Sequence, residues 1–253
     1  MDHRISFVVL GLLLGACSMP TVGVEARYAN LDAKGDVALA TGGNPVARNS
    51  LSDVGLDGEE GSLGLRGDLK FGSPHLTLST ESASWSGDGT LTGSFGGIVV
   101  GTTVESDLDL AIHRAILTFD VLPVPMVELG LGLGVSVLDI QASLEDTNTS
   151  TVEEIDETVP VPELAARLAV EFWRMRVEAL VGGMAYDAGG DRASYLDGDL
   201  NARVRLAGLG PVDGWLSVGY RMIGVDAEIE DGSDDIEIDT TFDGVYFGLR
   251  LSF

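Results

Sequence analysis

Apolar and polar residues alternate with a period of two over long stretches of the chain. From Val127 to Val137 every second residue is Val or Leu, and the residues between them are Glu, Gly or Ser. The stretches Tyr195–Leu206, Glu163–Phe172 and Ser62–Phe71 repeat the pattern. Because a period of two places one class of side chain on each face of a β-sheet, the sequence predicts an all-β fold.

The length of these stretches and of their connections favours a membrane-spanning barrel over a soluble antiparallel sheet. Many stretches reach the roughly 9–11 residues that a tilted transmembrane strand needs. The connections alternate between short ones, such as 72–74 and 173–174, and longer, more acidic ones, such as 145–158. Outer-membrane barrels have short turns at one end and longer loops at the other. We therefore expect a closed, antiparallel, up-and-down transmembrane β-barrel.

Counting strands with this parity gives ten, and eight is the alternative if the first pair is absent. One strand changes phase, because Leu108, Leu110 and Ile112 have even numbers whereas Leu117 and Phe119 have odd ones. Either a β-bulge near His113 or departure of the outer part of that strand from the hydrocarbon explains the change. The predicted strands lie roughly at 26–41, 61–71, 75–86, 103–121, 126–144, 161–173, 174–186, 193–207, 214–229 and 237–253.

The first residues are typical of an export signal. Arg4 precedes an apolar run, 5–16, that is too short to span a bilayer as a helix. Cys17, the one cysteine, follows Leu-Gly-Ala and resembles the lipid-acceptor cysteine of bacterial lipoproteins. We expect a signal peptide over 1–16, lipidation at Cys17, a tether over 17–25 and a barrel over 26–253. The alternative is an ordinary signal peptide with an incidental cysteine.

Charge excludes one class of partner. The formal net charge is −25, so the phosphates of a nucleic acid would be repelled. Many of the acidic residues occur in two runs, 153–157 and 231–239, and the second run includes Asp231, Asp234 and Asp235. We expect these acidic loops to be solvated, with weak binding of divalent cations as an open alternative. No metal site or resident cofactor is predicted.

The last strand carries the strongest motif. Val245, Phe247, Leu249, Leu251 and Phe253 alternate with polar or small residues, and Phe253 is the final residue printed. This resembles the C-terminal signal of Gram-negative outer-membrane barrels, and the architecture is similar to that of small OmpW-like and OmpA-like barrels. The resemblance implies residence in the outer membrane, contact with lipid and lipopolysaccharide, acidic loops outside, and recognition by the barrel assembly machinery. The implied assembly signal consists of Tyr246, Phe247, Leu249, Leu251 and Phe253.

The face opposite the apolar rows carries charges of both signs. We expect this face to fill the lumen with ion pairs, because narrow barrels are filled by side chains; a selective pore is the alternative. The predicted network comprises Arg66, Asp68, Asp107, Asp109, Glu128, Arg167, Glu171, Arg176, Glu178, Asp197, Asp199, Arg203, Arg205, Arg221 and Arg250.

No catalytic residues are predicted. Beyond the signal, the chain has two histidines, His75 and His113, and neither occurs in a motif of a hydrolase. The leading hypothesis is a non-enzymatic barrel with a role in envelope structure or surface interaction. A narrow channel for small solutes or ions and a soluble periplasmic β-sandwich lipoprotein remain as alternatives.

Overall fold

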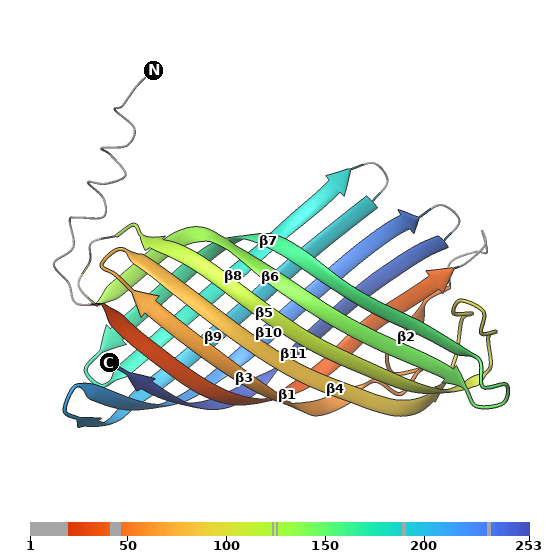
Figure 1. The fold of residues 1–253 in the computed structure, drawn as a ribbon, viewed down its shortest axis with the longest axis horizontal. Helices are drawn as coiled ribbons and strands as arrows, with labels where there is room; N and C mark the ends of the chain where they lie inside the picture. The colour runs from red at the N-terminus through yellow and green to blue at the C-terminus, as the bar shows by residue number, and fades with distance from the viewer. Residues whose placement is uncertain (1–19, 41–46, 123, 125, 189–190, 232–233) are drawn as a thin grey trace, which may run out of the picture.

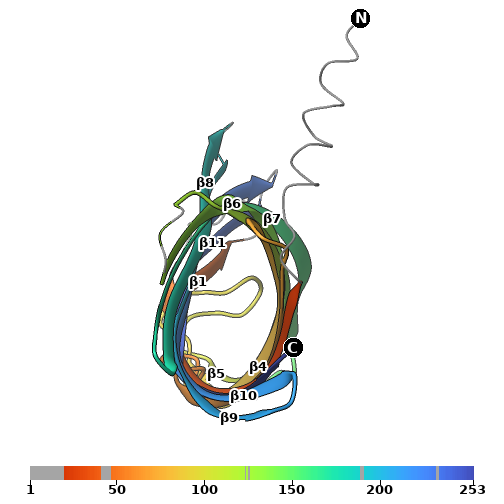
Figure 2. The same cartoon turned by 90° about the vertical axis from the view of Figure 1, so that its left-hand side faces the viewer.

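A computed structural model describes residues 20–40, 47–122, 124, 126–188, 191–231 and 234–253. Ten of its strands form one antiparallel sheet that closes on itself, because β1 pairs with β11 from Gly23↔Ser252 to Ala40↔Asp235. Figure 2 looks into this ring, which has an elliptical outline. The ring contains β1 (Thr21–Ala40), β3 (Gly58–Lys70), β4 (Pro74–Thr90), β5 (Thr103–Asp120), β6 (Val127–Asp146), β7 (Val152–Phe172), β8 (Met175–Ala188), β9 (Asp191–Leu209), β10 (Val212–Asp231) and β11 (Asp234–Ser252).

The prediction of a closed, all-β, up-and-down barrel is confirmed. All ten predicted strands are present, so the eight-stranded alternative is wrong, and one closed sheet rules out a β-sandwich. The first strand begins at Thr21, five residues before the predicted barrel boundary at 26. A further two-residue strand, β2 (Asn49–Ser50), pairs with β1. The described residues include no helix long and apolar enough to cross a membrane.

The two ends of the barrel differ. Tight connections join β3 to β4, β7 to β8 and β9 to β10 at the end that also holds the C-terminus, which we name the turn end (Figure 1). Gly72, Trp173 and Gly210 have positive φ in these turns. At the opposite, loop end, the connections after β1 and β4 are long. We name residues 47–57 loop L1 and residues 91–102 loop L2.

Most strands have apolar outward residues near the turn end and apolar inward residues near the loop end. Near the turn end β5 points Leu117 and Phe119 outward, whereas near the loop end it buries Leu108 and Leu110 inside. Its register with β4 and β6 is unbroken, so the predicted bulge near His113 is wrong. The outward residues of β5 near the loop end are instead polar, among them Glu105, Asp107 and Asp109, in agreement with the second interpretation.

This exchange divides the outer surface of the barrel into two zones. Near the turn end, large apolar side chains point outward on every strand of the ring and form the outer apolar band. Strands of 13–21 residues exceed the length that a membrane requires, so they project beyond this band. Members of the band include Val22, Val24, Leu63, Leu65, Leu78, Leu117, Phe119, Leu131, Leu133, Leu164, Leu168, Val177, Val181, Leu196, Leu200, Leu216, Val218, Val245, Phe247, Leu249 and Leu251.

The loop-end half of the lumen is filled by an apolar core. Wall residues such as Leu31, Trp85, Leu108 and Phe242 pack there against residues of L1 and L2. Figure 2 shows L2, in yellow, folded into the ring. The loop residues that contribute to this core are Leu51, Val54, Leu56, Leu91, Phe95 and Ile98.

The wall is split between β7 and β8. These strands pair from Phe172↔Met175 only as far as Leu164↔Gly183, although β7 continues along β6 to Val152 and β8 along β9 to Ala188. Figure 1 shows the hairpin of β8 and β9, in cyan, diverging from β7, in green. We name this opening the β7–β8 split. The shorter ladder between β3 and β4 is instead covered by L1, where the Thr90 N–H donates to the Asp53 carbonyl oxygen at 2.7 Å.

We expect a charge in the outer apolar band to cost far more than the same charge above it. Leu133→Arg, in the band on β6, should destabilise the folded barrel in bilayers by about 2–4 kcal/mol. Gln141→Arg, also outward on β6 but nearer the loop end, is the matched control and should cost about 0–1 kcal/mol. Urea titration of folding into lipid vesicles measures both, and equal costs would contradict a lipid-facing band.

Candidate functional site

The turn-end half of the lumen holds a network of ion pairs, which we name the ion-pair plug. Its side chains are all less than a third exposed, and they include nine of the fifteen Lys and Arg residues of the chain. The nine anions balance these nine cations, so the net charge of −25 lies outside the plug. The plug consists of Arg27, Arg66, Lys70, Arg114, Arg167, Arg176, Arg203, Arg221 and Arg250 with Glu25, Asp68, Glu81, Asp120, Glu128, Glu163, Glu178, Asp197 and Asp199.

Several pairs join walls that are far apart in the ring. Arg66 on β3 pairs with Glu178 on β8, and four strands of the ring separate these two on either side. Arg66 Nη1 also lies 3.9 Å from Asp199 on β9. Both Arg66 and Glu178 are almost fully buried. These contacts cross the lumen, so the plug closes the barrel at this level.

A second set of contacts crosses the lumen from β5. Arg114 donates to Glu163 on β7 at 3.0 Å and to Asp197 on β9 at 2.7 Å. Glu163 also accepts a hydrogen bond from the Ser136 hydroxyl at 3.2 Å. A Cβ atom at Gly182 would lie 1.8 Å from Glu163 Oε2, so the glycine on β8 makes room for this carboxylate.

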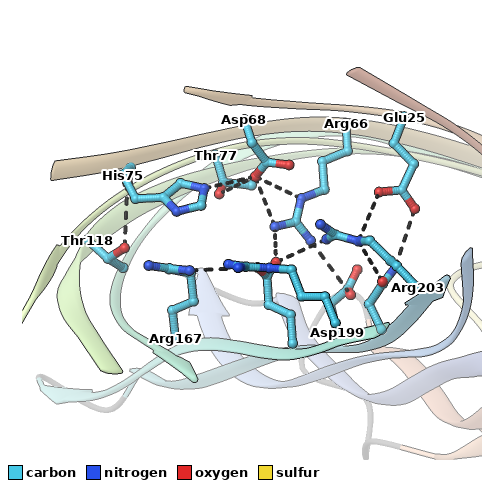
Figure 3. A network of polar contacts seen from close by, with 12 residues as sticks. Glu25, Arg66, Asp68, His75, Thr77, Thr118, Arg167, Asp199 and Arg203 are labelled. Carbon is cyan, nitrogen blue, oxygen red and sulfur yellow. Dashed lines mark hydrogen bonds and ion pairs between the residues drawn. The ribbon is translucent and has the colours of Figure 1, made fainter. Parts of the chain in front are cut away.

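Asp68 is shared by several donors (Figure 3). The Thr77 hydroxyl lies 2.9 Å from Asp68 Oδ1, Arg66 Nη2 lies at the same distance, and His75 Nε2 lies at 3.2 Å. Arg250 binds the other carboxylate oxygen. His75 is thus buried and bound to a carboxylate that two arginines neutralise, which is the environment of a structural histidine.

At the turn end the plug opens into a mouth. Lys70 contacts Glu128 at 2.6 Å, and Glu128 also binds Arg167 and Arg176 at 2.8 Å each. A cavity of about 590 Å³ lies beside these residues, with Trp173 at its rim. A second cavity of about 320 Å³ adjoins the first, and its lining reaches deeper plug residues, among them Asp68, Glu178 and Arg203.

The structure divides the predicted lumen residues into three groups. Glu171 and Arg205 lie at the turn-end rim, where they contact Arg176 at 3.2 Å and Asp213 at 2.5 Å. Asp107 and Asp109 point outward, so their placement in the lumen was wrong. The residues inside the lumen are Arg66, Asp68, Glu128, Arg167, Arg176, Glu178, Asp197, Asp199, Arg203, Arg221 and Arg250.

The error at Asp107 and Asp109 has a physical cause. Sequence reasoning assigned polar residues to the lumen along the whole strand, whereas the lumen is apolar at this height. The predicted network also lacked several residues of the plug. An unbroken period of two, extended back to Thr21, would have placed them inside: Glu25, Arg27, Glu81, Arg114, Asp120 and Glu163.

The terminal strand contributes to both faces. Tyr246 points inward, where its hydroxyl donates to Asp199 at 2.9 Å and Arg27 lies 4.5 Å from its ring centroid. Phe247 and Phe253 point outward and are exposed. Leu249 and Leu251 lie in the same outward row. Cys17, the predicted lipid acceptor, lies outside the described residues, as do the predicted signal peptide and the first three residues of the tether, 17–19.

The remaining polar groups lie at the surface. His113 is outward and exposed, 2.9 Å from the Thr80 hydroxyl and 3.7 Å from Asp139. At the loop end the Thr149 hydroxyl and the Asn148 N–H donate to Asp146 and hold the pKa of that carboxyl below its ordinary value. Within the described ranges no group of three or more His, Cys, Asp or Glu residues is arranged to hold a metal ion.

Comparison with solved structures places the fold among outer-membrane barrels. The outer membrane protease OmpT of Escherichia coli matches with a TM-score of 0.51 at 10% identity, over 92% of this chain and 97% of OmpT. The attachment invasion locus protein Ail of Yersinia pestis has a TM-score of 0.34 at 9% identity, over 91% of this chain and 99% of Ail. A Pseudomonas aeruginosa FadL homologue has a TM-score of 0.32 at 13% identity, covering 92% and 90%.

The likeness to OmpT is one of fold. The chain has the architecture of a Gram-negative outer-membrane β-barrel. No protein-family model matches the sequence, and no curated protein matches it.

We expect the plug to be sensitive to loss of one partner and tolerant of loss of both. Arg114→Met leaves the buried Glu163 with only the Ser136 hydroxyl and should destabilise the barrel by about 3–5 kcal/mol. Adding Glu163→Gln should recover part of that loss. Arg174→Met, at an exposed turn residue, is the control and should cost less than about 1 kcal/mol. Urea unfolding of the wild type, of Arg114→Met, of Glu163→Gln and of the double variant measures the cycle, and additive losses would contradict the pairing.

Proposed function

We propose that this protein is a non-conducting, non-enzymatic barrel of the bacterial outer membrane that presents an acidic outer extension for surface interaction. The observation that carries the proposal is the double closure of the lumen. Charged side chains such as Arg66 and Glu178 meet across it near the turn end, and an apolar core with L1 and L2 fills it near the loop end. We infer that these two levels together block a continuous water-filled path.

The proposed orientation follows from the same geometry. The outer apolar band lies near the turn end, so the loop end projects into water. In outer-membrane barrels the longer loops face the exterior. The acidic hairpin residues Glu154 and Asp156 are exposed on the projecting part of β7. In this orientation they face the medium and the phosphates of lipopolysaccharide, to which divalent cations bridge carboxylates.

An assembly role is proposed for the last strand. Phe247, Leu249, Leu251 and Phe253 form a continuous outward apolar row, while Tyr246 faces the plug. Strand pairing with the barrel assembly machinery is the mode of recognition that such an edge offers. Lipidation of Cys17 by the export pathway remains part of this proposal, on the sequence pattern alone.

The channel alternative is weaker because both levels of the lumen would have to open. The enzyme alternative lacks an arrangement of residues to support it. His75 is bound to a neutralised Asp68 inside the plug, and His113 lies on the outer wall. Neither has the geometry of a base beside a nucleophile among the residues described.

We expect no steady single-channel steps from the purified protein in planar bilayers. The Arg66→Ala/Glu178→Ala variant should also stay closed, because the apolar core seals the lumen independently of the plug. Heat-modifiable migration in SDS gels confirms that each protein is folded. Steady conductance of the wild-type protein would overturn the non-conducting proposal, and conductance of the variant alone would assign the seal to the plug.

We expect opposite accessibility at the two ends of the barrel. In a Cys17→Ser background, Asn148→Cys at the loop end should react with a membrane-impermeant maleimide on intact cells. Ser73→Cys, exposed at the turn end, should react only after the outer membrane is permeabilised. Labelling of Ser73→Cys but not Asn148→Cys on intact cells would reverse the orientation.

A further inference from the structure

The loop-end half of the lumen contains a cavity with an aliphatic lining, which we name the outer cavity. Its free volume is about 80 Å³. Leu108 and Leu138 line it from one wall, and Ile223 and Phe242 line it from the other. Glu237 and Thr240 are its polar neighbours, and Glu237 is engaged by Arg48 at 2.6 Å. Apolar cavities of this kind stay dry and take up apolar ligands.

The outer cavity is closed toward the medium. Leu51, Val54 and Leu56 of L1 and Phe95 of L2 are buried over it. L1 is tied to the wall by the hydrogen bond from Thr90 to Asp53. L2 is tied by its Gly97 N–H, which donates to Glu153 at 2.9 Å. A ligand approaching along the barrel axis therefore meets a packed cap.

Toward the β7–β8 split, the outer cavity is bordered by apolar residues that are partly exposed. At the β7–β8 split, Val159 and Tyr186 point toward the lumen, yet they are 42% and 50% exposed. A closed wall would cover them. Next to them Val161 and Met184 are half-buried against the apolar core, and Ile155 lines the cavity itself. Apolar side chains thus run from the split to the cavity.

The lower end of the split coincides with the edge of the outer apolar band. The last paired residue of β7, Leu164, is 72% exposed and belongs to the band, as do Val181 on β8 and Leu196 on β9. Beyond these, the outward residues of β7 become polar at Thr158 and Asp156. The split therefore begins where hydrocarbon gives way to polar surroundings.

Two prolines keep the split open. β7 pairs with β6 without interruption through Pro160 and Pro162, so the N–H groups that these residues lack would have faced β8. At these two positions β7 offers β8 carbonyl acceptors but no N–H donors, and the pairing with β8 ends at Leu164. The opening is thus a property of the sequence of β7.

We propose that the outer cavity binds a hydrocarbon chain of an outer-leaflet lipid, which reaches it sideways through the β7–β8 split. The inference rests on the membrane placement in the proposed function. An aliphatic lining without a free polar partner suits an acyl chain better than a polar solute. The cap over the cavity and the position of the split favour a chain from the membrane over a molecule from the medium.

The test uses Trp85, which is buried on the wall with its ring centroid 5.2 Å from that of Phe242. Trp173→Phe and Trp215→Phe leave Trp85 as the sole tryptophan of the three. In bilayers of phosphatidylcholine brominated on its acyl chains, Trp85 fluorescence should fall at least twofold relative to unbrominated bilayers. Ala142→Phe fills the cavity and should abolish most of this quenching, while heat-modifiable migration shows that the barrel remains folded.

A second variant and a second quencher separate the alternatives. Pro160→Thr/Pro162→Thr restores both N–H groups and should lower the quenching by extending the β7–β8 ladder. A brominated fatty acid added to unbrominated bilayers tests a free chain as the source, and quenching by it alone would overturn the lipid proposal. Equal quenching with and without Ala142→Phe would mean quenching through the wall and would also overturn it. Both results are independent of the bilayer conductance and the maleimide labelling that test the proposed function.

Discussion

Most strands of this barrel have to satisfy two different surroundings along one continuous run of residues. Near the turn end the outside is apolar and the lumen is charged, whereas near the loop end the outside is polar and the lumen is apolar. Ring closure satisfies the backbone hydrogen bonds at the level of the outer apolar band, and the change of surroundings along each strand is met by its side chains. In β5 the inward row passes from Leu108 to Arg114 with no interruption of its pairing. The turn-end half of the barrel thus has the side-chain arrangement of a membrane protein, and the loop-end half has that of a water-exposed protein. The same strands form both halves.

The two halves of the lumen are stabilised in different ways. In the plug, each buried charge is stabilised by oppositely charged partners on other strands. Removal of one partner leaves a buried charge unpaired, which costs far more than removal of both. In the outer half, burial of apolar surface drives packing, as in a soluble domain. The apolar core tolerates a lateral opening in the wall, whereas a split at the level of the plug would admit lipid to charged groups.

Much of the fold follows from the sequence because a period of two reports the faces of a sheet directly. The ten strands and the short turns were predicted in this way. The inward position was predicted correctly for Arg167 and Asp197 but wrongly for Asp107 and Asp109. The period of two shows which residues share a face of the sheet, but it does not show whether that face lines the lumen or the outer surface. Deciding that requires the height of a residue along the barrel, which depends on strand tilt and register. Cross-lumen pairs such as Arg66 with Glu178 lie 112 positions apart in sequence, and no local pattern encodes them.

The unpaired edge of β7 has a consequence for crowding in a membrane. An open strand edge is a template on which another chain can add a strand, and natural proteins protect such edges. Pro160 and Pro162 withhold two successive donors from anything that approaches along that edge. We expect this to disfavour edge-to-edge joining of neighbouring barrels through β7 at high density, even though each wall stands partly open.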